Sequence, residues 1–121
     1  MELTQFEVVT FSLNPTLPTG ILMVGLPMCT GAIQELTSAV SLACRKKIGP
    51  ISLVRVPHDP YLKCGYGWSI VFFNDAEDSK KAVDELKHVS IDGREAEVKV
   101  FRLLDVKMET DEDGKIRFKL P

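Results

Sequence analysis

The chain has 121 residues, of which 45% are hydrophobic and 26% are charged, so its composition suits one globular domain with a single core. A formal net charge of -2 argues against bulk attraction to nucleic-acid phosphates but leaves room for a local basic patch. With no apolar run long enough to span a membrane and no secretory signal pattern, we expect an intracellular protein, either cytoplasmic or nuclear.

A short strand and a helix come first in the central part of the chain. The apolar run GILMVGLP, residues 20–27, predicts a strand that ends at a glycine and a proline. Thr30 is the candidate N-cap of a helix over residues 31–47, in which apolar residues recur at helical spacing. This helix ends in a basic cluster, for which a solvated helix end is the simplest interpretation: Arg45, Lys46 and Lys47.

Two further strands and a second helix follow. Residues 51–56 are rich in β-branched side chains and predict a strand, and the two prolines of residues 57–63 indicate a loop. The run YGWSIVFF, residues 66–73, predicts the third strand. Asn74 is the candidate N-cap of the second helix, because Glu77 follows three residues later as in a capping box.

A fourth strand, predicted at residues 96–103, completes the order β-α-β-β-α-β. This order predicts an α+β fold, the ferredoxin-like split βαβ sandwich, in which a four-stranded antiparallel sheet carries two helices on one face. We expect a single domain over residues 1–121. Its expected parts are a core at 20–103, an N-terminal extension at 1–19 with a strand at 6–13, and a C-terminal β-hairpin extension at 104–121.

The third strand carries a recognisable motif. The RNA recognition motif has the strand pattern K/R-G-F/Y-G/A-F-V-x-F/Y, and residues 66–73 match it at Gly67, Trp68, Ser69, Val71 and Phe73. Tyr66 and Ile70 depart from it, and on the first strand Leu22 and Gly25 replace the usual aromatic and asparagine. The chain therefore resembles an RNA recognition motif (RRM) with degenerate ribonucleoprotein motifs.

Two branches of that family are relevant to function. The long first helix and the proline after the second strand resemble the RRM of subunit b of eukaryotic translation initiation factor 3, a branch that serves mainly in protein docking. The U2AF homology motifs instead use an Arg-x-Phe sequence after the second helix. Here that place holds Arg94-Glu95-Ala96, which lacks the phenylalanine, so the resemblance gives no support to that mode.

Side chains alternate along a strand, so the register implied by the resemblance divides the sheet between a helix-covered face and an outer face. Family members stack bases on outer-face aromatics, at ~1–3 kcal/mol per base, and here only Trp68 holds a usual stacking position. Aliphatic neighbours such as Leu22 and Ile70 favour apolar protein contact instead. The expected outer face, our candidate RNA-binding or partner-binding site, comprises Leu22, Val24, Leu53, Arg55, Trp68, Ile70, Phe72, Lys99 and Phe101.

An outer face this apolar exceeds the patch that a monomer normally exposes, so we expect it to be covered. We favour cover by one of the chain's own ends, and a partner protein or RNA are the alternatives. The candidate covering side chains are Ile116, Phe118 and Leu120 at the C-terminal end, and Phe6, Val8 and Phe11 at the N-terminal end. The loop after the second strand adds three candidate RNA contacts, which are otherwise solvated loop residues: His58, Tyr61 and Lys63.

The sequence predicts a non-catalytic binding module of a ribonucleoprotein, translation or mRNA-processing assembly, with protein contact dominant and RNA binding weak. A single-stranded RNA-binding module that stacks bases on Trp68 is the alternative. An acylphosphatase-like enzyme on the same scaffold is a minor one, because neither His58 nor His88 has a neighbouring Cys or Ser and no phosphate-cradling loop is present. Cysteine spacing suits neither a metal site nor a disulfide framework, so we expect no metal and no cofactor.

Overall fold

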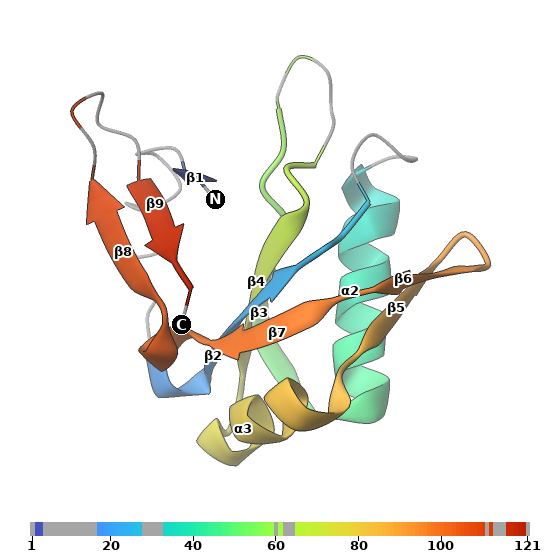
Figure 1. Ribbon diagram of the computed structural model, residues 1–121. Helices are drawn as coiled ribbons and strands as arrows, with labels where there is room; N and C mark the ends of the chain where they lie inside the picture. Colours follow the sequence, from blue (N-terminus) through green and yellow to red (C-terminus); the bar gives the residue numbers. More distant parts are fainter. Residues whose placement is uncertain are drawn as a thin grey trace.

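The computed structural model describes residues 2–3, 17–27, 33–59, 61, 65–110, 112 and 116–120. Within them the predicted α+β fold is confirmed: a four-stranded antiparallel sheet in the order β3-β4-β2-β7 carries two helices (Figure 1). The elements of this core are β2 (Gly20–Val24), α2 (Ile33–Lys47), β3 (Ile51–Arg55), β4 (Trp68–Phe73), α3 (Ala76–Glu85) and β7 (Lys99–Arg102).

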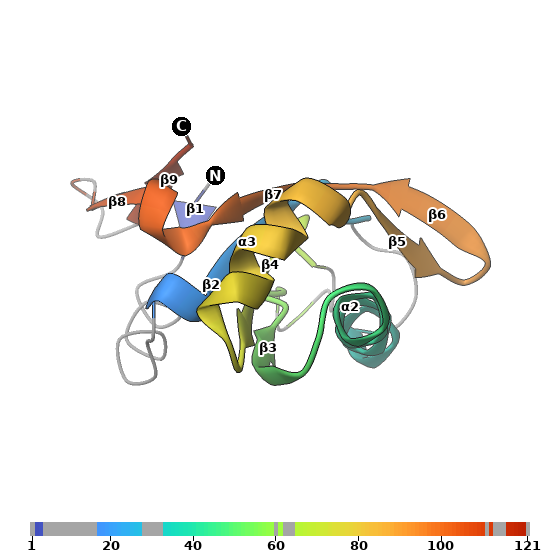
Figure 2. The same cartoon turned by 90° about the horizontal axis from the view of Figure 1, so that it is seen from below.

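Both helices lie on the same side of the sheet, as the view from below shows (Figure 2). Alternate strand residues point to that side and pack on α2 and α3, because strand side chains have a period of two. Ile21 and Met23 of β2, Val71 and Phe73 of β4, and Val40 of α2 are all at most 1% exposed and belong to one hydrophobic cluster. The expected helix-covered face is therefore present.

The fourth predicted strand is divided in the structure. Residues 96 and 97 end the short strand β6 (Arg94–Glu97), which pairs with β5 (His88–Ile91), a strand that the sequence did not predict. Asp92 and Gly93 form the turn between them with positive φ values of 53° and 75°. Val98 then separates β6 from β7, so the hairpin β5–β6 extends from the sheet alongside α2 (Figure 1).

The second helix begins one residue later than expected. Its N-cap is Asp75, whose side chain accepts a hydrogen bond from the backbone N–H of Glu77 at 3.1 Å. The prediction that Asn74 is the cap is therefore wrong. Asparagine and aspartate are both favoured at the N-cap of a helix, so the sequence alone does not show which of Asn74 and Asp75 is the cap. The predicted cap of α2, Thr30, lies outside the described residues.

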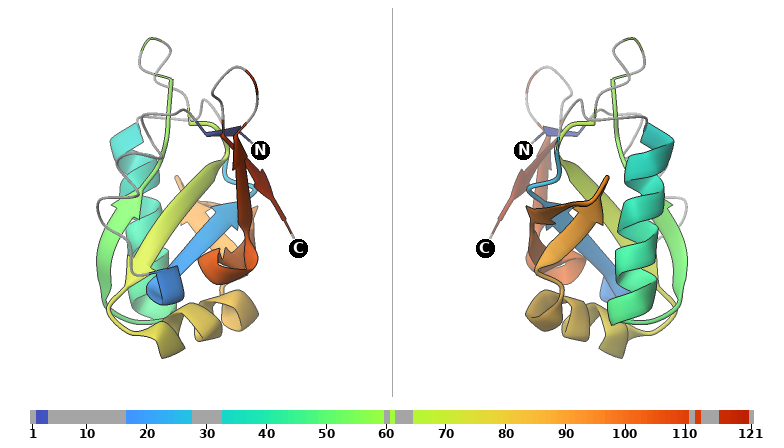
Figure 3. Two further views of the ribbon diagram at one scale, coloured as in Figure 1. Left: turned by 90° about the vertical axis from the view of Figure 1, so that its left-hand side faces the viewer. Right: turned by 90° about the vertical axis from the view of Figure 1, so that its right-hand side faces the viewer.

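The predicted C-terminal hairpin is confirmed. Strands β8 (Lys107–Thr110) and β9 (Ile116–Lys119) pair antiparallel, and the two-residue strand β1 (Glu2–Leu3) adds to the other edge of β9. The two ends of the chain are thus joined in one small sheet, on the opposite side of the main sheet from α2 (Figure 3). The strand expected at residues 6–13 lies outside the described residues.

Cys44 of α2 is a free, fully buried thiol in the helix-side core. Burial raises its pKa from 9.0 to about 12, because the thiolate would be desolvated there. Cys44 is therefore a packing residue of the core, whereas Cys29 and Cys64 lie outside the described residues.

We expect Cys44 to make the fold sensitive to alkali. Its pKa is higher in the folded than in the unfolded chain, so its contribution to stability is complete below pH 9 and is lost as the pH rises towards about 12. The measurement is the free energy of unfolding between these limits, compared with that of Cys44→Ala. The variant should lose less stability over this range, and parallel losses in the two proteins would contradict the assignment.

Candidate functional site

The nine predicted outer-face residues lie at adjacent register positions on four neighbouring strands. Leu22 of β2 is opposite Ile70 of β4 on one side and opposite Phe101 of β7 on the other. Val24 is likewise opposite Trp68 and opposite Lys99. At the β3 edge, Leu53 is paired with Phe72 and Arg55 with Ile70. The sheet therefore brings all nine residues together.

Most of this outer face is closed to water. Leu22, Trp68, Ile70 and Phe72 are at most 2% exposed, although no partner molecule is present. They form a second hydrophobic cluster, separate from the helix-side core, on which Val24 and Leu53 pack as partly buried neighbours. Since only the chain itself is available to cover them, the burial agrees with the expected intramolecular cover.

Part of the cover is the segment that directly follows the sheet. Leu103, at the start of the 3-10 helix η2 (Leu103–Asp105), is 7% exposed and belongs to the outer-face cluster, and Val106 packs against it. The sequence analysis placed Leu103 at the end of the last predicted strand and assigned it no covering role, because its contact with Gly20 joins positions that are far apart in sequence.

Gly20 makes room for this contact. A Cβ atom on Gly20 would lie 2.4 Å from Cδ1 of Leu103 and 2.9 Å from Cε1 of Phe72, both closer than van der Waals contact allows. Gly20 is opposite Phe72 in the sheet, so Leu103 lies over the end of the outer face where β2 begins. The absence of a side chain at this strand position lets η2 approach the sheet closely.

The two outer-face cations differ in their surroundings. Lys99 is exposed, whereas Arg55 is only partly exposed. The Nε of Arg55 is buried and, within the described part of the chain, makes no hydrogen bond. Such a donor normally has a partner, because leaving it unsatisfied costs free energy. The β3 edge of the outer face therefore retains an unused donor beside apolar side chains.

The described residues of the segment between β3 and β4 extend beyond the end of the sheet (Figure 1). Tyr61 is 92% exposed, and its backbone N–H donates to Oδ1 of Asp59 at 2.8 Å. His58 is exposed and bridges to Gly65 across the base of the loop. Two of the three predicted loop contacts are thus presented to solvent, and the third, Lys63, lies outside the described residues.

Three other features of the described residues concern metal-binding groups, the basic cluster of α2 and helix length. No group of three or more His, Cys, Asp or Glu side chains among them is arranged to hold a metal ion. The basic cluster at the end of α2 is solvent-exposed, and Lys46 and Lys47 line a depression of about 340 Å³ between α2 and β5, together with Leu42 and His88. No described helix is long and apolar enough to cross a bilayer.

The element order and the sheet define an α+β domain of the split βαβ type, and comparison with known proteins shows which proteins it is similar to. The family model described as RNA recognition motif matches residues 43–97. The chain is similar to Sex-lethal RNA recognition domains 1 and 2 from Drosophila melanogaster, with 26% identity and a TM-score of 0.51, over 68% of this chain and 47% of that chain. It thus spans about half the length of that relative.

The fold is also similar to that of the Rna15 RRM with bound RNA (GU), with 18% identity and a TM-score of 0.50, over 69% of this chain and 80% of that chain. A second structure of the RNA15 RRM gives 18% identity and a TM-score of 0.51, over 69% of this chain and 86% of that chain. The chain therefore resembles RNA recognition motifs in sequence over residues 43–97 and in its fold.

We expect Trp68 to act first as a packing residue. Trp68→Ala should lower the free energy of unfolding by about 3–5 kcal/mol, since it removes a fully buried aromatic side chain. Tyr61→Ala is the control, because Tyr61 is 92% exposed and its loss should change stability by less than about 0.5 kcal/mol. Urea denaturation measures both, and a stable Trp68→Ala variant would show that the outer face is open.

Proposed function

We propose that this chain is a non-catalytic binding module of a ribonucleoprotein, translation or mRNA-processing assembly, whose outer face serves mainly in protein contact. Single-stranded RNA is a secondary ligand. The match to the RNA recognition motif model supports a binding module over an enzyme, and the resemblance to initiation factor 3 subunit b favours a translation setting. Such assemblies are cytoplasmic or nuclear, so an intracellular location belongs to the same proposal.

The observation that carries this proposal is the burial of the outer face by the chain itself. Base stacking needs an accessible aromatic surface, but Trp68 is 1% exposed and Phe72 is 2% exposed. The aliphatic side chains of Leu22 and Ile70 lie between the aromatic positions and are equally buried. This surface matches protein side chains better than nucleobases, because its contacts are apolar and its cover is polypeptide.

In this proposal RNA contacts the rim of the domain, which comprises Tyr61, His58 and Lys99. Tyr61 presents an exposed aromatic ring in the segment between β3 and β4, with His58 nearer to β3. Lys99 adds an exposed cation at the edge of the outer face. One accessible ring and a few cations support weak, salt-sensitive binding without strong sequence preference.

The experiment is fluorescence anisotropy with a labelled single-stranded RNA of about eight nucleotides, a length within the usual site sizes. We expect a Kd on the order of 10⁻⁴ M at physiological salt, as for non-specific phosphate binding, weakening further as salt is raised. Tyr61→Ala should weaken binding, and Tyr66→Ala, also exposed, is the matched control. Tight binding that depends on Trp68 in the native fold would overturn the proposal in favour of the base-stacking alternative.

The protein-contact part has its own test. Affinity purification of the tagged protein from its native cell, with and without ribonuclease, should recover a stoichiometric protein partner that survives the ribonuclease. Recovery of RNA alone, or of proteins that are lost with the RNA, would contradict dominant protein contact.

A further inference from the structure

The strand β8 has one unpaired edge. Within the described residues the small terminal sheet has the order β1-β9-β8, so β9 lies between two strands, whereas β8 has a neighbour on one side only. In Figure 1, β8 runs along the margin of the molecule with β9 on its inner side. Alternate backbone N–H and C=O groups of an edge strand point outward, where they pair readily with a strand of another chain. The outer edge of β8 can therefore accept a further strand.

The edge of the main sheet at β3 is less suited to such pairing. The register of β3 against β4 shifts between Ile51 and Leu53. An irregularity of this kind disrupts the straight edge that an added strand needs. In contrast, β8 pairs with β9 in an unbroken register from Lys107 to Thr110, so its free edge is regular.

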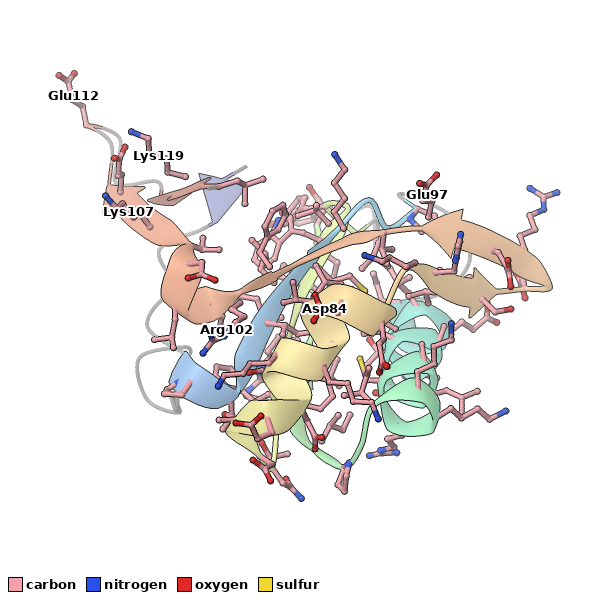
Figure 4. All side chains as sticks on the ribbon, turned by 60° about the horizontal axis from the view of Figure 1, so that its bottom comes forward. Asp84, Glu97, Arg102, Lys107, Glu112 and Lys119 are labelled. Atoms are coloured by element: carbon pink, nitrogen blue, oxygen red, sulfur yellow. The ribbon has the colours of Figure 1, made fainter. Side chains whose placement is uncertain are left out.

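The charges of the hairpin are unbalanced at the start of β8. Lys107 is directly opposite Lys119 in the register, and both side chains are exposed. Figure 4 shows the two lysines on the hairpin, away from the two helices. In the described part of the chain neither ammonium group forms an ion pair. Like charges directly opposite each other weaken a strand pair, so an acidic residue on the free side of Lys107 would offset this repulsion.

The strand β8 itself contains a suitable acidic residue, Glu109, which is exposed. When two copies of one strand pair antiparallel about a two-fold axis, the residue at the axis is opposite its own copy. An axis at Lys107 would place lysine opposite lysine, and an axis at Glu109 would place glutamate opposite glutamate. An axis at Met108 places Lys107 of each copy opposite Glu109 of the other. Among these registers only the one at Met108 is favoured by charge.

We propose that β8 is a self-association edge, through which two copies of this chain pair antiparallel about Met108 and join their terminal sheets into one. The two-fold symmetry means that the Lys107–Glu109 pair forms twice. This self-complementary charge pattern favours a second copy over a strand of another protein. A four-residue edge buries less area than a standard interface, so the dimer is weak, with a Kd on the order of 10⁻⁴ M. The inference goes beyond the proposed function, because β8 belongs neither to the outer face nor to the rim.

Sedimentation equilibrium of the full chain, at concentrations from about 10⁻⁵ to 10⁻³ M, measures the association. Lys107→Glu and Glu109→Lys should each weaken it at least about 10-fold, because both symmetry-related pairs then oppose like charges. The double variant that combines these two changes exchanges the charges and should restore association to within about threefold of the unmodified chain. Glu112→Lys is the control: it makes the same charge change at an exposed residue outside β8 and should leave association unchanged.

Amide hydrogen exchange locates the contact, because the protection of β8 should rise with protein concentration while that of β3 should not. Circular dichroism shows whether each variant is folded. Lys107→Glu removes the like-charge pair with Lys119, so it tests the edge without weakening the hairpin even if Glu109→Lys does not fold. A chain that stays monomeric at every concentration, or a dimer that the single variants leave unchanged, would overturn the proposal. So would a folded double variant that does not regain association, or pairing of β8 only with a strand of another protein.

Discussion

The burial of apolar side chains on both faces of one sheet is the constraint on which the structure depends. Phe73 and Val71 of β4 are buried in the cluster on the helix side of the sheet. Their neighbours Phe72 and Ile70 are buried in the second cluster, on the opposite face. A strand whose side chains are apolar on both faces of a sheet exposes a large apolar patch unless both faces are covered. The segment that follows β7 meets part of this requirement, because Leu103 and Val106 supply apolar contacts to the outer face.

This constraint also distinguishes the chain from the RNA recognition motifs that it resembles in fold. RNA recognition motifs expose aromatic rings for bases, whereas here aliphatic Leu22 and Ile70 occupy central positions and the aromatic Trp68 is packed. The same fold thus places a different chemistry on its outer face, which is consistent with the general rule that sites, and not folds, determine function. What remains accessible is the rim, where Tyr61 and Lys99 are exposed.

Sequence patterns predicted the core because its signals are local. Apolar runs at residues 20–24 and 68–73 and the helical spacing of α2 are each sufficient to indicate their element. Strand alternation assigned the outer-face residues only together with the register that the resemblance to RNA recognition motifs implies. The short strand β5 was missed because four alternating residues carry little periodic signal. Leu103 was missed for a different reason: its contact with Gly20 joins positions far apart in sequence, and no local pattern reports such proximity.

The central claim is that the chain itself closes the outer face when no ligand is bound. The most direct measurement is the set of nuclear Overhauser effects from the methyl groups of Leu103 in the isolated protein. Closure of the outer face by Leu103 predicts strong nuclear Overhauser effects from its methyl groups to the ring of Phe72 and to the α protons of Gly20. Absence of these contacts in a folded chain, together with a Trp68 ring in contact with water, would contradict it.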